Sequence, residues 1–116
     1  MEIQYTELEN GIRLITLIGT LDMQGTFSVE VQFARYCAGK GVRVLVDLSG
    51  VKYLSSIGIP MLINTARSVV SQDGKMGLVG PSYDVHRVLE ITGVTLIIPI
   101  FHDFDTAVAE ISKEAS

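Results

Sequence analysis

The sequence holds one cysteine, Cys37, no tryptophan and few aromatic residues of any kind. A single cysteine excludes an internal disulfide and fits a reducing compartment, so a cytoplasmic protein is expected. Basic residues are also few: nine Lys and Arg are scattered among thirteen Asp and Glu, for a net charge of −4. Without a basic cluster, nucleic-acid binding is not expected.

Long apolar runs and leader signals are missing as well. Met1 passes directly into EIQYTEL, so no secretory leader is expected. The apolar stretches fall far short of the roughly 20 residues that span a bilayer, so no direct membrane insertion is expected. With 116 residues, 47% of them hydrophobic, the chain is predicted to form a single domain over residues 1–116 with an aliphatic core.

Residues for catalysis or metal binding are equally sparse. His86 is expected to face solvent and His102 to lie in a connection, and neither has metal-ligand spacing to a Cys, an Asp or the other His. Cys37 has the context of a small buried residue more than of a nucleophile. No Gly-rich phosphate loop occurs. The sequence therefore predicts no catalytic residue, no metal, no cofactor and no enzyme activity.

Strand-like and helix-like periods alternate along the chain. Strands are predicted at residues 2–8, 12–18, 42–48, 75–80 and 96–101, the first two joined by the turn signal Asn10-Gly11. Helical stripes cover 27–38, 62–70, 85–92 and 104–111, with Asp103 as the N-cap of the last. The fold class is α/β: a small, mainly parallel sheet with an N-terminal antiparallel hairpin strand and about four helices. Pro99 places the last strand at an edge.

The first helix carries two apolar stripes. Phe27, Val31, Ala34 and Ala38 fit one face, and Val29, Phe33 and Tyr36 lie on another. A helix that is apolar nearly all round is either deeply buried or exposes a patch to a partner, and the sequence leaves both open.

Ser55 and Ser56 stand where a buried strand meets a helix. Pro60 must lie in the first helical turn, because a proline inside a helix costs about 3 kcal/mol, and this places the N-cap between Ser56 and Gly58. Either serine could cap the helix through its hydroxyl. Asp22 follows the second strand, where it is either a helix cap or a polar contact at the same sheet edge. Both segments follow strands of the parallel sheet, and the carboxyl ends of such strands lie at the same end of the sheet. We therefore expect Asp22 to lie near Ser55 and Ser56.

Three segments together resemble the STAS domain of anti-sigma factor antagonists. They are Gly19-Thr20-Leu21-Asp22, then Asp47-Leu48-Ser49 followed by Tyr53-Leu54-Ser55-Ser56-Ile57-Gly58, and Gly93 with Ile98-Pro99-Ile100-Phe101 and Asp103. The resemblance implies a protein that binds an anti-sigma factor, a GHKL-type serine kinase, and so releases a sigma factor. A PP2C-type phosphatase is a further implied partner, and a weak homodimer is left open. The alternative is a STAS subunit of a transport or stressosome-like complex.

The two loops that follow parallel strands emerge at one end of the sheet and define the expected site. Partner binding is expected at Asp22, Met23, Ser55, Ser56, Ile57, Gly58 and Ile59, extended by Val29, Phe33 or Tyr36, and Gly58→Arg is expected to abolish binding without unfolding the protein. In the family, the kinase phosphorylates the residue just before the glycine that corresponds to Gly58, and here that residue is Ile57. Ser56 is therefore the expected substitute acceptor and Ser55 the minor one, with a constitutive, unphosphorylated binder as the alternative.

Overall fold

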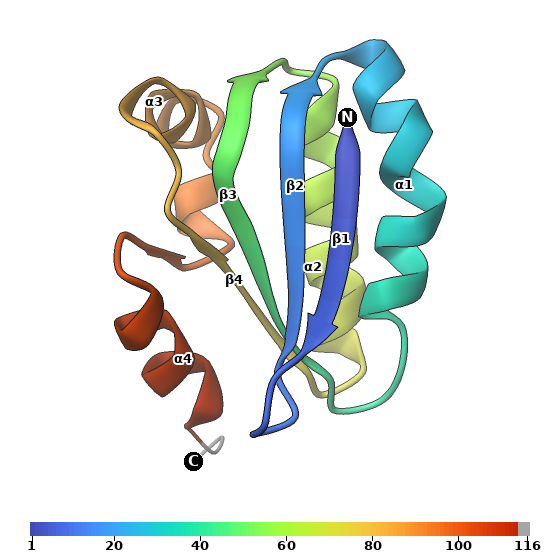
Figure 1. Ribbon diagram of the computed structural model, residues 1–116, viewed down its shortest axis with the longest axis vertical. Coiled ribbons are helices and arrows are strands. Elements are labelled where there is room, and N and C mark those ends of the chain that lie inside the picture. Colours follow the sequence, from blue (N-terminus) through green and yellow to red (C-terminus); the bar gives the residue numbers. More distant parts are fainter. Residues whose placement is uncertain (114–116) are drawn as a thin grey trace.

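A computed structural model describes residues 1–113 and confirms an α/β fold (Figure 1). Helices alternate with the strands after an opening β-hairpin, as the period switches predict. In chain order the elements are β1 (Glu2–Glu7), β2 (Arg13–Leu21), α1 (Met23–Cys37), β3 (Arg43–Leu54), α2 (Gly58–Ser71), β4 (Lys75–Val79), α3 (Tyr83–Ile91), the 3₁₀ helix η1 (Val94–Leu96), β5 (Ile100–Phe101) and α4 (Phe104–Ser112).

The five strands lie side by side in the order in which they occur along the chain. β1 and β2 are antiparallel, with Tyr5 opposite Ile15, and the other neighbours are parallel. The hairpin turns at Asn10-Gly11, where Gly11 has a φ of +82°, a conformation that favours glycine. This confirms the mainly parallel sheet with one antiparallel hairpin strand.

The direction of the crossovers explains how the helices are layered. Each parallel strand is added on the same side of the previous one, so right-handed crossovers place their helices on one face. The larger core cluster accordingly joins buried residues of α1, α2 and α3, such as Phe33, Leu62 and Leu89. Helix α4 follows the last strand of the described residues, so it does not connect two parallel strands. It covers the other face of the sheet, where Ala107 and Ile111 pack with Leu45.

β3 is the longest strand, lies at the centre of the sheet and delivers the serine loop. Val44, Val46 and Leu48 are fully buried on the side of α1 and α2. The strand runs on to Leu54, beyond the predicted end at residue 48, because β2 pairs with it as far as Leu21 opposite Leu54. The loop at the carboxyl end of β3 therefore begins at Ser55.

The last strand is much shorter than the predicted 96–101. Val94–Leu96 form the 3₁₀ helix η1, and only Ile100 and Phe101 pair with β4, opposite Leu78 and Val79. Pro99 has no N–H to extend this ladder, and β5 does form one edge of the sheet, as Pro99 predicts. The carboxylate of Asp103 caps α4 by accepting from the Thr106 N–H at 2.8 Å. No described helix has the length and apolar character of a membrane span.

Candidate functional site

The loops that follow β2 and β3 are joined directly to each other. Ser55 donates twice to the Leu21 carbonyl oxygen, from its backbone N–H at 3.0 Å and from its hydroxyl at 2.9 Å. Asp22 and Met23 come immediately after Leu21, so they lie beside the serine loop. The expected proximity of Asp22 to Ser55 and Ser56 is therefore present in the structure.

Asp22 is the N-cap of α1. Its Oδ1 accepts from the Gly25 N–H at 2.7 Å, and its backbone carbonyl accepts from the Thr26 N–H at 2.9 Å. Gly25 is required at this point, because a Cβ there would lie 2.0 Å from the Thr20 carbonyl oxygen. Asp22 is nevertheless exposed, as is Met23. The cap fixes where α1 begins and how it is rotated against the sheet.

The two serines have different environments. The half-buried Ser55 hydroxyl donates to Leu21 and accepts from the Ile57 N–H at 3.3 Å, so both of its hydrogen-bonding roles are filled. Ser56 is exposed, and within residues 1–113 its side chain makes no hydrogen bond. The N-cap of α2 is Ile57, inside the predicted interval, but neither serine caps the helix as an N-cap side chain.

Of the three residues after Ser56, only Ile57 is available to a partner. Its exposed fraction is 44%, whereas that of Ile59 is 7%. Gly58 is buried, and a Cβ there would lie 3.0 Å from Leu54 Cδ1 and 3.3 Å from the Leu21 carbonyl oxygen. Gly58→Arg would press against Leu54 and Leu21, so we expect this change to disturb the packing between the two loops as well as partner binding.

The expected extension along α1 lies on the wrong face of the helix. Val29 and Phe33 are buried in the core, and the half-buried Tyr36 stacks on Tyr5 with ring centroids 4.7 Å apart. These residues pack against the sheet because Gly25 sets the rotation of the helix, so Val29 and Phe33 cannot reach a partner.

The other apolar stripe of α1 is the exposed one. Met23, Phe27 and Val31 follow one another at four-residue spacing, and all three are exposed. Val31 shares a shallow groove of about 460 Å³ with Met61 of α2. Because Ile57 precedes α2 and Met23 opens α1, this stripe continues the surface of the two loops. Sequence reasoning listed Phe27 and Val31 as a helix stripe but did not assign them to the site.

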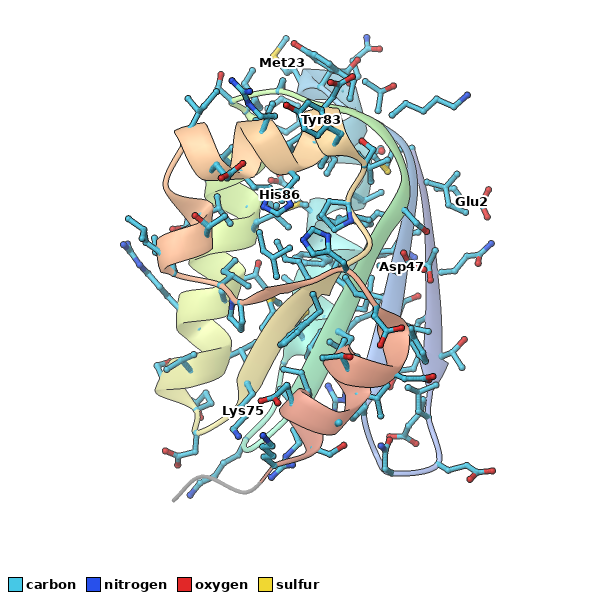
Figure 2. All side chains as sticks on the ribbon, turned by 90° about the vertical axis from the view of Figure 1, so that its left-hand side faces the viewer. Glu2, Met23, Asp47, Lys75, Tyr83 and His86 are labelled. Carbon is cyan, nitrogen blue, oxygen red and sulfur yellow. The ribbon has the colours of Figure 1, made fainter. Side chains whose placement is uncertain are left out.

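Side chains that could do chemistry are few and unconnected. Burial raises the pKa of the Cys37 thiol to about 12, so the thiolate that nucleophilic attack needs is scarce at neutral pH. His86, labelled in Figure 2, is half-buried and not solvent-facing as expected. Its ring stacks on that of His102 with centroids 5.1 Å apart. Among the described residues, no three His, Cys, Asp or Glu side chains are grouped to hold a metal ion.

A protein-family model matches most of the chain. The family model described as STAS domain matches residues 5–107. The TM1081 homologue of Thermotoga neapolitana is 33% identical over 69 residues, 60% of this chain and 61% of the relative, so the chain spans less than two thirds of that protein. The anti-sigma-F factor antagonist RsfB of Mycobacterium tuberculosis is 26% identical over 102 residues, 85% of this chain and 83% of RsfB.

Solved structures agree on the fold. An anti-sigma factor antagonist from Mycobacterium paratuberculosis superposes with a TM-score of 0.87 at 21% identity, over 97% of this chain and 94% of that one. The Bacillus cell fate determinant SpoIIAA in its phosphorylated form superposes with a TM-score of 0.70 at 15% identity, over 95% and 99%. At these identities the likeness establishes the shared fold.

Proposed function

The chain belongs to the STAS domain family, and from this premise we propose that it is an anti-sigma factor antagonist. It binds an anti-sigma factor, a GHKL-type serine kinase, in the cytoplasm and so frees a sigma factor. The proposal depends on one observation above all. Two loops locked together by the Ser55–Leu21 hydrogen bonds present exposed polar and apolar side chains on one continuous surface. Relatives described as anti-sigma factor antagonists support the same reading.

The proposed contact region, named here the partner surface, is smaller at the serine loop and longer on α1 than the sequence suggested. Its members are the exposed residues of the two loops and of the outer α1 stripe: Asp22, Met23, Phe27, Val31, Ser56 and Ile57. Exposed apolar residues beside a few polar ones are typical of a protein-binding site. Gly58 and Ile59 support this surface from beneath.

Binding is the whole activity in this proposal. The protein performs no catalysis and needs no cofactor, and its state is set by enzymes that act on it. The kinase adds a phosphate, and a PP2C-type phosphatase removes it. The carbonyl, hydroxyl and amide groups of the serine loop serve to hold the loop in place.

Ser56 is the proposed phosphate acceptor. Its hydroxyl is exposed, whereas a phosphate on Ser55 would break the bond to the Leu21 carbonyl and open the contact between the loops. On Ser56 the phosphate would lie near the N-terminus of α2, whose free N–H groups tolerate negative charge. It would add about −1.5 to −2 units of charge beside Ile57 and Met23, and the partner would have to desolvate that charge to bind.

A binding experiment tests the surface. Ile57→Glu should weaken capture of the cognate kinase at least tenfold in calorimetry or a pull-down, because it places a charge at the centre of the apolar contact. Ile91→Glu is the matched control: Ile91 is also an exposed isoleucine, but it lies at the end of α3. Equal affinities for the two variants would refute the surface. If no anti-sigma kinase binds wild-type protein, the antagonist function itself fails.

A phosphorylation experiment tests the switch separately. After incubation with the kinase and ATP, mass spectrometry should find one phosphate on Ser56, and Ser56→Ala should abolish most of it. Ser49→Ala, an exposed serine on β3, is the control and should be modified like wild type. Phosphate on Ser49 or Ser82 would contradict the assignment. Binding without any phosphate would identify a constitutive antagonist.

A further inference from the structure

A groove follows the edge of the sheet at the start of β4. β5 pairs only with Leu78 and Val79, so in the described part of the chain Lys75–Gly77 have no strand on that side. The groove lies between α2 and α4, with Lys75 at its lower end in Figure 2, and has a volume of about 500 Å³. Its apolar side chains are Ala66, Val70, Met76, Ile97, Pro99, Phe101 and Ile111.

The rim of the groove exposes aliphatic side chains. Val70 is 62% exposed, Leu96 is 89% exposed, and Ile97 next to it also lines the groove. Together these three side chains form an exposed apolar patch beside the groove, of the kind that marks protein contact sites. An interface of standard size buries about 800 Å² per partner, somewhat more than half of it apolar. The groove and its apolar rim could form the central, apolar part of such an interface.

The charges on this patch favour a partner with the same surface. Lys75 and Glu110 both line the groove, so the patch carries one charge of each sign. Glu110 contacts Lys113 at 2.9 Å, and Lys75 Nζ donates to the Lys113 backbone carbonyl. Both contacts are exposed; an exposed ion pair is worth little, so both side chains can exchange these partners for new ones. In a two-fold dimer each residue i meets j while j meets i, so Lys75 of one copy can face Glu110 of the other. A strongly acidic or strongly basic partner would gain nothing here.

We propose that the groove is the interface of a weak two-fold homodimer. Leu96 of each copy packs into the groove of the other, between Val70 and Pro99. The elements involved are the C-terminal half of α2, the start of β4, η1 and α4, and none of them contributes to the partner surface. The dimer is therefore independent of the proposed function and leaves both partner surfaces free.

Sedimentation velocity from about 10 µM to about 1 mM, a range suited to a weak complex, tests the dimer. Wild type should shift from monomer to dimer as its concentration rises. Val70→Asp and Leu96→Asp should each raise the dissociation constant at least tenfold. Val31→Asp is the matched control, since Val31 is also a helical valine and is 61% exposed against 62% for Val70. It should dimerise like wild type.

Charge reversal tests the pairing within the interface. Lys75→Glu and Glu110→Lys should each weaken the dimer, and the double variant should restore it, which a merely structural role would not do. Circular dichroism checks that each variant is folded. A wild-type protein that stays monomeric at about 1 mM, a dimer that survives Val70→Asp and Leu96→Asp, or one lost in Val31→Asp would overturn the proposal.

Discussion

Helix α1 carries two apolar stripes that the structure uses in opposite ways. Val29, Phe33 and Cys37 are buried against the sheet, whereas Met23, Phe27 and Val31 are exposed. Both stripes repeat every four residues, and each contains one phenylalanine and at least one valine or methionine. Hydrophobicity and period therefore cannot tell them apart. Gly25 can, because its contact with the Thr20 carbonyl turns the face that begins at Gly25 toward the sheet.

Truncating the two phenylalanines should give the largest contrast. Phe33→Ala leaves a cavity in the core and should lower the free energy of unfolding by about 3–5 kcal/mol. Phe27→Ala removes an exposed ring and should change it by no more than about 0.5 kcal/mol. Urea unfolding followed by circular dichroism measures both. Similar losses in the two variants would mean that the faces are not distinct.

Charging the exposed stripe should affect binding without affecting stability. Phe27→Asp should weaken kinase binding by about 2 kcal/mol, roughly thirtyfold, if Phe27 is an anchor of the contact. Its unfolding free energy should stay close to that of wild type. Calorimetry with the cognate kinase measures the affinity, and Val70→Asp, outside the partner surface, serves as the control. Unchanged affinity in Phe27→Asp would confine the contact to the two loops.

Alkaline pH should report on the buried stripe through Cys37. Burial raises the pKa of the folded thiol from 9.0 to about 12, while Arg13 nearby acts to lower it. Above pH 9 the unfolded thiol loses its proton and the folded one keeps it. The stabilisation is thus complete below pH 9 and is lost toward pH 12, at up to about 1.4 kcal/mol per pH unit. The free energy of unfolding, measured from pH 8 to 10.5, should fall with this slope in wild type, and the slope should be absent in Cys37→Ala. Parallel curves would contradict it.

The smallest change in stability is expected from substitutions of Asp22, the N-cap of α1. Asp22→Ala removes the acceptor for the Gly25 N–H and should lower the free energy of unfolding by about 1 kcal/mol. Asp22→Asn should keep most of that stability, because asparagine also caps helices well. Thermal unfolding measures both variants. If Asp22→Asn also retains kinase affinity, the role of Asp22 is to position α1. If it loses affinity at unchanged stability, the carboxylate charge itself contacts the partner.

Much of the architecture follows from local sequence signals. Asn10-Gly11, Pro60, Pro99 and Asp103 each act through their own backbone or side chain, and each was correctly interpreted. The predictions that failed depend on contacts between distant residues. The burial of Gly58 comes from Leu21 and Leu54, and the half-burial of His86 accompanies its stacking on His102. Ser55 and Ser56 are neighbours in the sequence, and only the Leu21 carbonyl distinguishes them.

The sequential strand order has a consequence for how the protein comes to be folded. Every strand pairs with the one made just before it, so no strand waits for a distant segment to be synthesised. Each parallel pair nevertheless joins residues one β-α unit apart, such as Arg13 and Val44, and such non-local pairing is intrinsically slow. A chain leaving the ribosome could add each β-α unit to a sheet that already exists, in the N-to-C order in which domains form during synthesis. Within the described residues, the short β5 would then be the last strand added, and α4 would cover the opposite face after it.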